Sequence, residues 1–240
     1  MIRGWTPIGG ARATTPPKAV RVRDGRPVLA IMARAPRLGQ GKSRLAKEIG
    51  RAEAWRINRA LQALTLARVI DSRWRVVLVV TPDNARTLAL PEVWPRGIER
   101  RAQGRGDLGA RMARAARRER RIALIGTDCP GVTRTHIAAA FRALTRRAVA
   151  IGPTEDGGFW IFAARRGAEA ARAFAGVRWS SADTLSDVLG RLGREPAELV
   201  TLRDVDVAAD WRVLGRRMFR SHQKRAIHPP PGEGRGQRVG

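Results

Sequence analysis

The sequence predicts a three-layer α/β domain with a largely parallel central sheet. Short apolar runs that suit buried strands alternate along the chain with stretches of helical period. A length of 240 residues fits one good-sized domain, or one domain with tails. No run of about 18 apolar residues occurs, so neither a membrane-spanning helix nor membrane insertion is expected.

Strand and helix positions follow from these patterns. The strand at 158–163, which follows two glycines, is the one that we expect to run antiparallel. The runs interpreted as strands are 28–33, 76–80, 98–102, 122–125, 148–152, 158–163 and 199–202. Helices are expected over 52–71 and 110–118, and after Lys42, after Thr133 or Thr135, after Ser180 or Ser181, and after Asp206.

The two ends of the chain lack any hydrophobic period. We therefore predict a disordered or loosely attached arm over 1–27, a folded domain over 28–218 and a disordered basic tail over 219–240. The start of the chain has no apolar segment typical of a signal peptide, so a cytoplasmic location is expected. The single cysteine, Cys129, excludes an internal disulfide and a cysteine-based zinc cluster.

A formal net charge of +26 raises nucleic-acid binding as an alternative function. The basic residues are nearly all arginine and are spread through every segment. We interpret them as a solvated basic face that reflects drift in composition, with some non-specific affinity for polyanions but no specific nucleic-acid partner. The sequence leaves the oligomeric state open.

The first candidate site follows the first strand, in a turn that contains two glycines. Gly39 and Gly41 let the backbone approach a ligand, and Lys42, Ser43 and Arg44 open the next helix. Free N–H groups at a helix N-terminus together with two cations suit a phosphate. The turn is nearly a Walker A loop but has Pro36 where that loop needs glycine, so a P-loop NTPase is not favoured. A plain turn with surface cations explains this motif about equally well.

Acidic residues follow several of the predicted strands. Asp128 lies just beyond the strand at 122–125, at the carboxyl end where open α/β sheets bind ligands. We expect it to hold a divalent metal that carries a nucleotide's phosphates, although capping the next helix is the simpler role. Glu155 and Asp156 precede two glycines between two apolar runs, which turn formation alone does not require. Asp107 and Asp206 suit helix caps, and Asp206 suits metal ligation about equally well.

Five motifs occur in a fixed order that resembles a known family. The motifs are Ala35-Pro36-x-x-Gly39-x-x-Lys42-Ser43-Arg44-Leu45, Asp107-Leu108-Gly109-x-x-Met112, Gly126-Thr127-Asp128-Cys129-Pro130-Gly131, Gly152-Pro153-x-Glu155-Asp156-Gly157-Gly158 and Trp179-Ser180-Ser181. Over about residues 28–215 the chain resembles the bacterial radical-SAM/selenodomain-associated transferases of DUF2064 type, which have a glycosyltransferase-A (GT-A) fold. These are related to phospholactate guanylyltransferases and molybdenum-cofactor nucleotidyltransferases.

The chain departs from the family's pattern at three positions. Arg34 replaces a usual lysine, Ser43 a usual threonine and Phe159 a usual tyrosine. No charge is lost, but the missing tyrosine hydroxyl removes one potential hydrogen bond to a ligand.

The resemblance implies a transferase that takes a nucleotide or nucleotide-sugar donor, a small-molecule acceptor and a divalent metal, Mg²⁺ or Mn²⁺. Glycosyl transfer is the expected reaction; nucleotidyl transfer is the alternative, and a non-catalytic nucleotide- or nucleic-acid-binding protein is a distant one. The expected metal ligands are Asp128 with Asp156 or Asp206, and the expected catalytic residues are Glu155 and Asp156. Phosphate contacts are assigned to Pro36, Gly39, Gly41, Lys42, Ser43, Arg44, Asp107 and Gly109, and substrate contacts to Gly157, Gly158, Trp179, Ser180 and Ser181.

Overall fold

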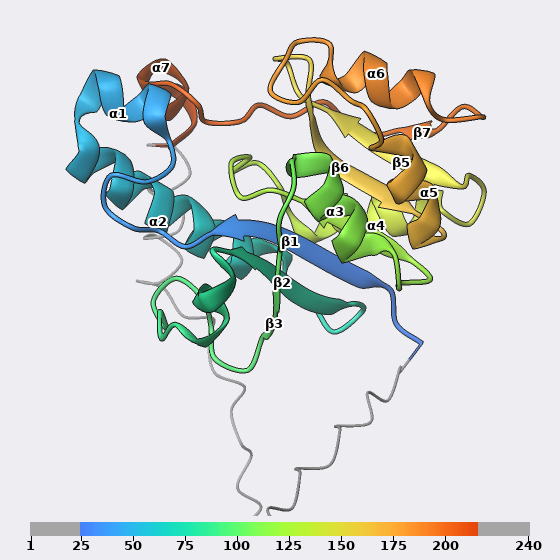
Figure 1. Cartoon of the computed structure of the whole chain (residues 1–240), viewed down its shortest axis with the longest axis horizontal. Coiled ribbons are helices and arrows are strands. Elements are labelled where there is room, and N and C mark those ends of the chain that lie inside the picture. Colours follow the sequence, from blue (N-terminus) through green and yellow to red (C-terminus); the bar gives the residue numbers. More distant parts are fainter. Residues whose placement is uncertain (1–24, 216–240) are drawn as a thin grey trace, which may run out of the picture.

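The structure, a computed structural model, describes residues 25–215 and contains one 7-stranded sheet (Figure 1). The strand order is β3-β2-β1-β4-β6-β5-β7. The strands are β1 (Val28–Arg34), β2 (Arg75–Thr81), β3 (Glu99–Ala102), β4 (Ile122–Ile125), β5 (Val149–Pro153), β6 (Phe159–Ala164) and β7 (Ala197–Glu198). Most of the predicted arm and the whole predicted tail lie outside the described residues.

The sheet is mostly parallel, as predicted. Strand β1 pairs in parallel with β2 and β4, β2 with β3, and β5 with β7. Only β6 runs against its neighbours, β4 and β5, which confirms the expected antiparallel strand. The carboxyl ends of β1, β2, β3, β4 and β5 therefore meet at one edge, where loops can gather around a ligand.

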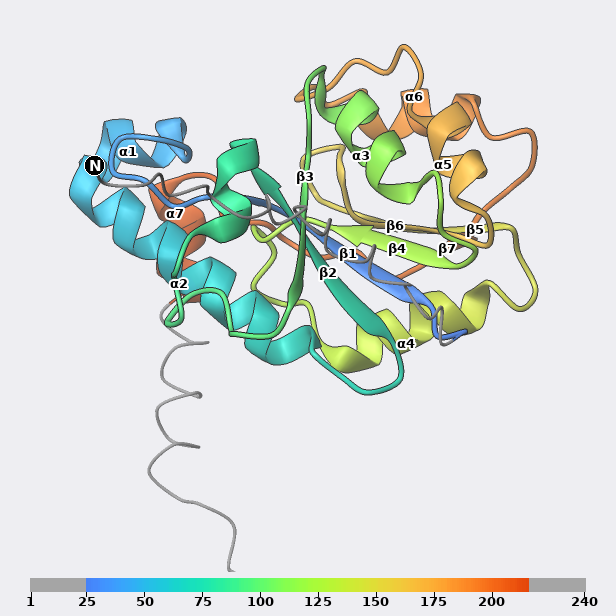
Figure 2. The ribbon, with the colours of Figure 1, turned by 60° about the horizontal axis from the view of Figure 1, so that its bottom comes forward.

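Helices cover both faces of the sheet and give the predicted three layers (Figure 2). One face packs on α2 (Arg51–Val69) and α4 (Arg134–Ala143), and the other on α3 (Leu108–Ala116), α5 (Gly167–Ala173) and α6 (Thr184–Gly190). A third, smaller apolar cluster joins α2 to α1 (Ser43–Ile49) and α7 (Ala208–Asp210). The remaining elements are η1 (Asp83–Thr87) and η2 (Trp211–Gly215).

Two of the predicted helix caps are confirmed. Asp107 accepts a hydrogen bond from the Ala110 N–H at the start of α3, and Thr133 accepts one from the His136 N–H at the start of α4. Helix α4 and the residue after it pack on the core through one apolar stripe, in which Ile137, Ala140, Phe141 and Leu144 are all buried.

Other expectations about local structure are wrong. The last strand is β7 at Ala197–Glu198, and within the predicted 199–202 run only Leu202 makes an isolated bridge, with Thr154. Neither Ser180 nor Ser181 caps α6, because the chain turns at Ser180 and the Ser181 hydroxyl instead accepts from the N–H of Asp183. Asp206 does not cap α7 either.

The segment that leads into α7 explains why. Val207 occupies the N-cap position, and the Asp210 carboxylate accepts from the N–H groups of Asp206 and Val207. The Asp206 side chain is therefore left for other partners.

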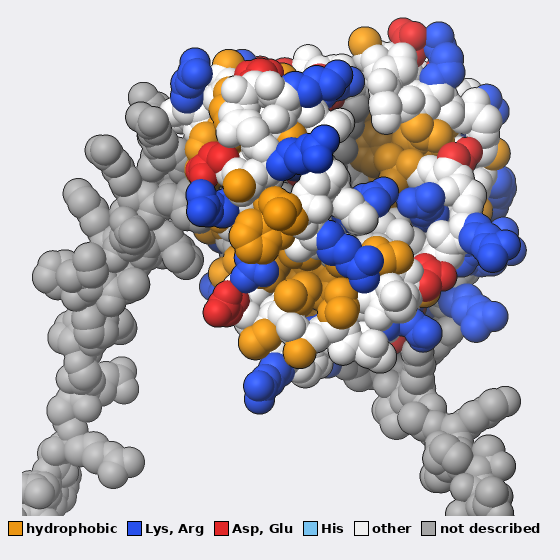
Figure 3. Space-filling view, turned by 60° about the vertical axis from the view of Figure 1, so that its left-hand side comes forward, with side chains coloured by type: hydrophobic (Ala, Val, Ile, Leu, Met, Phe, Trp, Pro, Cys, Tyr) orange, Lys and Arg blue, Asp and Glu red, His pale blue; other side chains and the backbone are white. Residues whose placement is uncertain are grey.

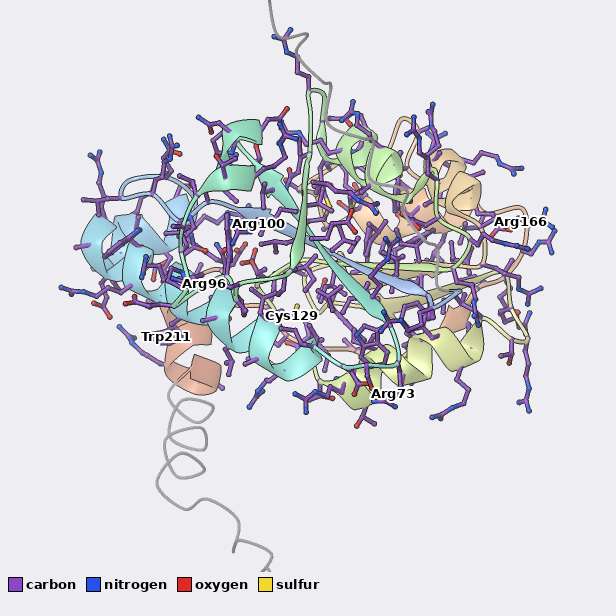
Figure 4. All side chains as sticks on the ribbon, turned by 90° about the horizontal axis from the view of Figure 1, so that it is seen from below. Arg73, Arg96, Arg100, Cys129, Arg166 and Trp211 are labelled. Atoms are coloured by element: carbon purple, nitrogen blue, oxygen red, sulfur yellow. The ribbon has the colours of Figure 1, made fainter. Side chains whose placement is uncertain are left out.

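Arginine side chains are dispersed over the molecule rather than gathered in one stripe. Figure 3 shows Lys and Arg scattered across one face, and Figure 4 shows Arg73, Arg96 and Arg166 in separate regions. This distribution agrees with a solvated basic surface. Among residues 25–215 no helix is both long enough and apolar enough to cross a membrane.

Candidate functional site

A cavity of about 770 Å³ lies at the edge where the parallel strands end. Segments distant in the sequence line it: the turn after β1, the turn after β4, the β5–β6 turn, and the stretches before α6 and α7. Of the predicted site residues, those that line this cavity are Gly41, Lys42, Ser43, Arg44, Asp128, Asp156, Gly158, Trp179, Ser180, Ser181 and Asp206. Pro36, Gly39, Asp107, Gly109, Glu155 and Gly157 do not line it.

Lys42 is buried at the start of α1, with only 6% of its side chain exposed. Its ammonium lies 2.9 Å from Asp128 Oδ1 and 3.6 Å from Asp206 Oδ1, and it donates to the Val205 carbonyl. Burial lowers the pKa of Lys42, but the ion pair and hydrogen bond with Asp128, together with the charges of Asp206 and Asp204, outweigh burial, and the pKa is raised overall. Lys42 is thus a protonated cation, and it ties the β1–α1 turn to the segment before α7.

Asp204, two residues before Asp206, was not among the predicted site residues. It is half-buried and lines the same cavity. Burial, with the nearby charges of Asp156 and Asp206, raises the pKa of Asp204 to about 6. Four carboxylates therefore share the cavity with Lys42 and Arg44, and Arg44 pairs with Asp206 at 3.2 Å.

Replacing Asp204 by asparagine should stabilise the metal-free protein at neutral pH. Because the folded pKa lies above the unfolded value, ionisation of Asp204 costs stability above pH 6 and little below pH 4. After discounting for solvent exposure, we expect a gain of about 1 kcal/mol, or about 2–4 °C in Tm, in EDTA at pH 7.5. Thermal unfolding from pH 4 to pH 8 checks this, and a gain that does not shrink as the pH falls would contradict it.

Asp156 is held in a fixed position in the turn that precedes β6. Its Oδ1 atom accepts hydrogen bonds from the Thr154 hydroxyl at 2.6 Å and from the Gly158 N–H at 3.1 Å. The neighbouring Glu155 instead forms an ion pair with Arg203 outside the cavity. Of the two acids predicted to be catalytic, the structure therefore brings only Asp156 to the site.

The predicted residues outside the cavity have contacts that support its walls. The Pro36 carbonyl accepts from the Trp55 indole N–H at 2.9 Å, and Asp107 caps α3. A Cβ atom on Gly109 would lie 2.6 Å from the Trp179 ring, so a glycine is needed for α3 to pack against Trp179. Gly39 lies in the β1–α1 turn with a φ of 77°.

Several polar residues of the cavity wall were missed from the sequence. Arg34 ends β1 and Arg111 lies on α3, and neither guanidinium forms an ion pair with another described residue. Asn58, Gln62 and Gln103 form a buried polar floor, in which Gln62 donates to the Arg34 carbonyl. Arg34 was predicted only as a departure from the family's pattern. Asn58, Gln62 and Arg111, which lie on helices, belong to no motif that indicates a ligand.

The carboxylates suit a hard divalent metal by their chemistry. Oxygen donors are the ligands that Mg²⁺ and Mn²⁺ prefer. In the conformation described for residues 25–215, no three His, Cys, Asp or Glu side chains converge on one point. Asp128, Asp156, Asp204 and Asp206 are the residues that would hold a metal.

Cys129 follows Asp128 and also lines the cavity wall. Figure 4 shows it near the middle of the molecule. Burial raises the pKa of its thiol well above the usual value, so the thiol stays protonated at neutral pH. We therefore assign it no nucleophilic role.

The sheet order, the antiparallel β6 and the site at the carboxyl edge define the GT-A-like fold of nucleotide-diphospho-sugar transferases, as predicted. A Desulfovibrio desulfuricans G20 protein with the provisional name nucleotide-diphospho-sugar transferase is similar, with a TM-score of 0.68, 23% identity and coverage of 83% of this chain and 95% of that chain. The 4-diphosphocytidyl-2C-methyl-D-erythritol synthase of Anaerococcus prevotii DSM 20548 is more distant, with a TM-score of 0.51, 13% identity and coverage of 82% and 100%.

A family model matches the middle part of the sequence. Residues 65–181 match the family described as "Uncharacterized protein conserved in bacteria (DUF2064)", which confirms the DUF2064 resemblance predicted from the motifs. This match includes Asp128, Asp156 and the 179–181 segment, but not Lys42 or Asp206. No curated protein matches the sequence.

Proposed function

We propose that this protein is a metal-dependent transferase that uses a nucleotide-activated donor, and that it transfers a glycosyl group from a nucleoside-diphosphate sugar to a small acceptor. One observation carries the proposal: the glycine turn with Lys42 and Arg44 lines the same cavity as Asp128, Asp156 and Asp206. A basic turn beside a carboxylate cluster is suited to a diphosphate with its cation.

The division of labour follows from the positions of these side chains. The backbone at Gly41 would lie close to the diphosphate. The cations Arg34, Lys42 and Arg44 would neutralise its negative charge. A bound Mg²⁺ or Mn²⁺ would stabilise charge on the leaving phosphate oxygens. Asp156, fixed by Thr154 and Gly158, is the carboxylate that we assign to orient the acceptor or take its proton.

A ligand screen with the full chain tests this function. Nucleotides and nucleotide sugars are added with Mn²⁺ or with EDTA, and the shift in Tm is measured. Donors that bind are then incubated with small acceptors, and the released group is identified. Release of nucleoside diphosphate supports glycosyl transfer, whereas release of pyrophosphate assigns nucleotidyl transfer instead. Absence of any metal-dependent stabilisation would overturn both.

Replacing Lys42 by alanine should weaken a nucleoside diphosphate about 10-fold or more and a nucleoside less than about twofold, because the lost contact is charge-assisted. Calorimetric titration of both ligands measures the difference. Lys47→Ala is the matched control, since Lys47 lies exposed on the same helix outside the cavity. Equal losses for both ligands would remove the phosphate role of Lys42.

A further inference from the structure

The cavity has two chemically different ends. The carboxylates Asp128 and Asp206 lie beside Lys42 and Arg44, next to α1 and α7. Figures 1 and 2 show α6 on the other side of the molecule from α1 and α7, with α3 between them. The residues that α3 presents to the cavity are Leu108, Arg111 and Met112, which share one helix face because they are three and four positions apart.

Arg111 is the charged residue of this second end. It is half-buried, and its Nε atom donates to the Gly106 carbonyl at 2.8 Å, which fixes the plane of the guanidinium. No acidic side chain among residues 25–215 forms an ion pair with it. A half-buried guanidinium with free donors is suited to a planar or tetrahedral oxyanion that accepts two hydrogen bonds.

The helix that carries Arg111 packs against an aromatic residue of the cavity, because Gly109 of α3 lies against the Trp179 ring. Ser180 and Ser181 line the cavity with Trp179 and Phe159, whose rings meet edge to face with centroids 6.4 Å apart. No described residue hydrogen-bonds to the Ser180 hydroxyl. The aromatic wall offers an apolar surface, and the hydroxyl and guanidinium offer polar contacts at its margin.

We propose that this end of the cavity binds the acceptor through an oxyanion group, a phosphate or a carboxylate, held by Arg111 and Ser180. The assignment of this end to the acceptor rests on the proposed function, in which the diphosphate occupies the α1 end. Arg111 is then a specificity-determining residue that selects acidic acceptors over neutral ones.

Equilibrium dialysis of the full chain against radiolabelled inorganic phosphate tests the proposal, with labelled acetate in parallel. Both titrations are run with and without saturating nucleoside diphosphate and Mg²⁺, which occupy the α1 end. We expect the wild type to bind one of the two anions when the nucleotide is present, and the stronger of the two identifies the group. Arg111→Gln should weaken that anion about 10-fold and Arg111→Lys less.

Two control measurements distinguish a failure of the Arg111 inference from a failure of the proposed function. Arg117→Gln, at the exposed end of α3 outside the cavity, should leave anion binding unchanged, and Arg111→Gln should bind the nucleoside diphosphate within about twofold of wild type. Failure of the wild type to bind any nucleotide contradicts the proposed function, and the anion titration without nucleotide then still tests Arg111. Equal anion binding by wild type and Arg111→Gln, or no anion binding by the wild type, overturns the inference.

Discussion

Replacing Asp128 by asparagine is expected to lower metal-dependent transfer by about 100-fold or more while leaving the fold intact. The amide keeps the size of the side chain, and about half of the Asp128 side chain is exposed, at 49%. The backbone carbonyl of Asp128 would still accept from the Val205 N–H at 2.9 Å. What is lost is a negative charge 2.9 Å from Lys42 in the carboxylate cluster.

The measurement is turnover of whichever donor the ligand screen identifies, as a function of Mg²⁺ or Mn²⁺ concentration. Asp128→Asn should need a higher metal concentration and reach a lower maximal rate, measured at temperatures where both proteins are folded in EDTA. Asp71→Asn is the matched control, because Asp71 pairs only locally with Arg73 and lies outside the cavity. An unchanged metal dependence in Asp128→Asn would remove Asp128 from the metal site.

Large apolar side chains made most of the fold predictable. The strands that carry runs such as those at 76–80 and 122–125 lie at the centre of the sheet, where both faces are buried. The helix α5 was not predicted, because its segment Gly167–Ala173 buries only glycine and alanine. Small residues give no visible hydrophobic period, although they let the helix pack closely.

The last strand was misplaced for a related reason. The run at 199–202 is apolar, but Val200 is 55% exposed and its carbonyl accepts a hydrogen bond from the Trp160 indole. Local composition could not show that the Trp160 indole, which belongs to β6, donates to the Val200 carbonyl, a group that would otherwise be open to a neighbouring strand. The regular pairing with β5 instead lies two residues earlier, at Ala197–Glu198, and within 199–202 only the N–H groups of Leu199 and Leu202 donate to β5 carbonyls.

Sequence reasoning located the site better than it assigned the individual residues. Strand-end positions and glycine turns are local features, and they predicted that Lys42, Asp128 and Asp156 would share one cavity. Whether a carboxylate points inward depends on tertiary contacts, so Glu155, paired with Arg203, could not be separated from Asp156 by sequence. Arg111 was missed because a lone arginine in a basic chain carries no local signal.

Gly157→Ala is expected to destabilise the protein by about 3 kcal/mol, the largest stability effect that we predict. Gly157 has a φ of 85°, a left-handed conformation that a residue with Cβ adopts at a cost. A Cβ at this position would also lie 2.1 Å from the Ala182 carbonyl oxygen, so backbone must move. The Gly157 carbonyl accepts from the Leu185 N–H at 2.9 Å, which joins the β5–β6 turn to the start of α6.

The backbone movement caused by Gly157→Ala should also displace residues of the cavity, because Asp156 precedes Gly157 and Ser181 precedes Ala182. We therefore expect Tm to fall by about 6–12 °C and donor turnover to fall at temperatures where the variant is still folded. Gly190→Ala in α6 is the control: no atom lies within 4 Å of the added Cβ, and its Tm should stay within about 2 °C of wild type. A Gly157→Ala protein with wild-type Tm and turnover would show that the 182–185 segment moves freely and does not hold Asp156 in place.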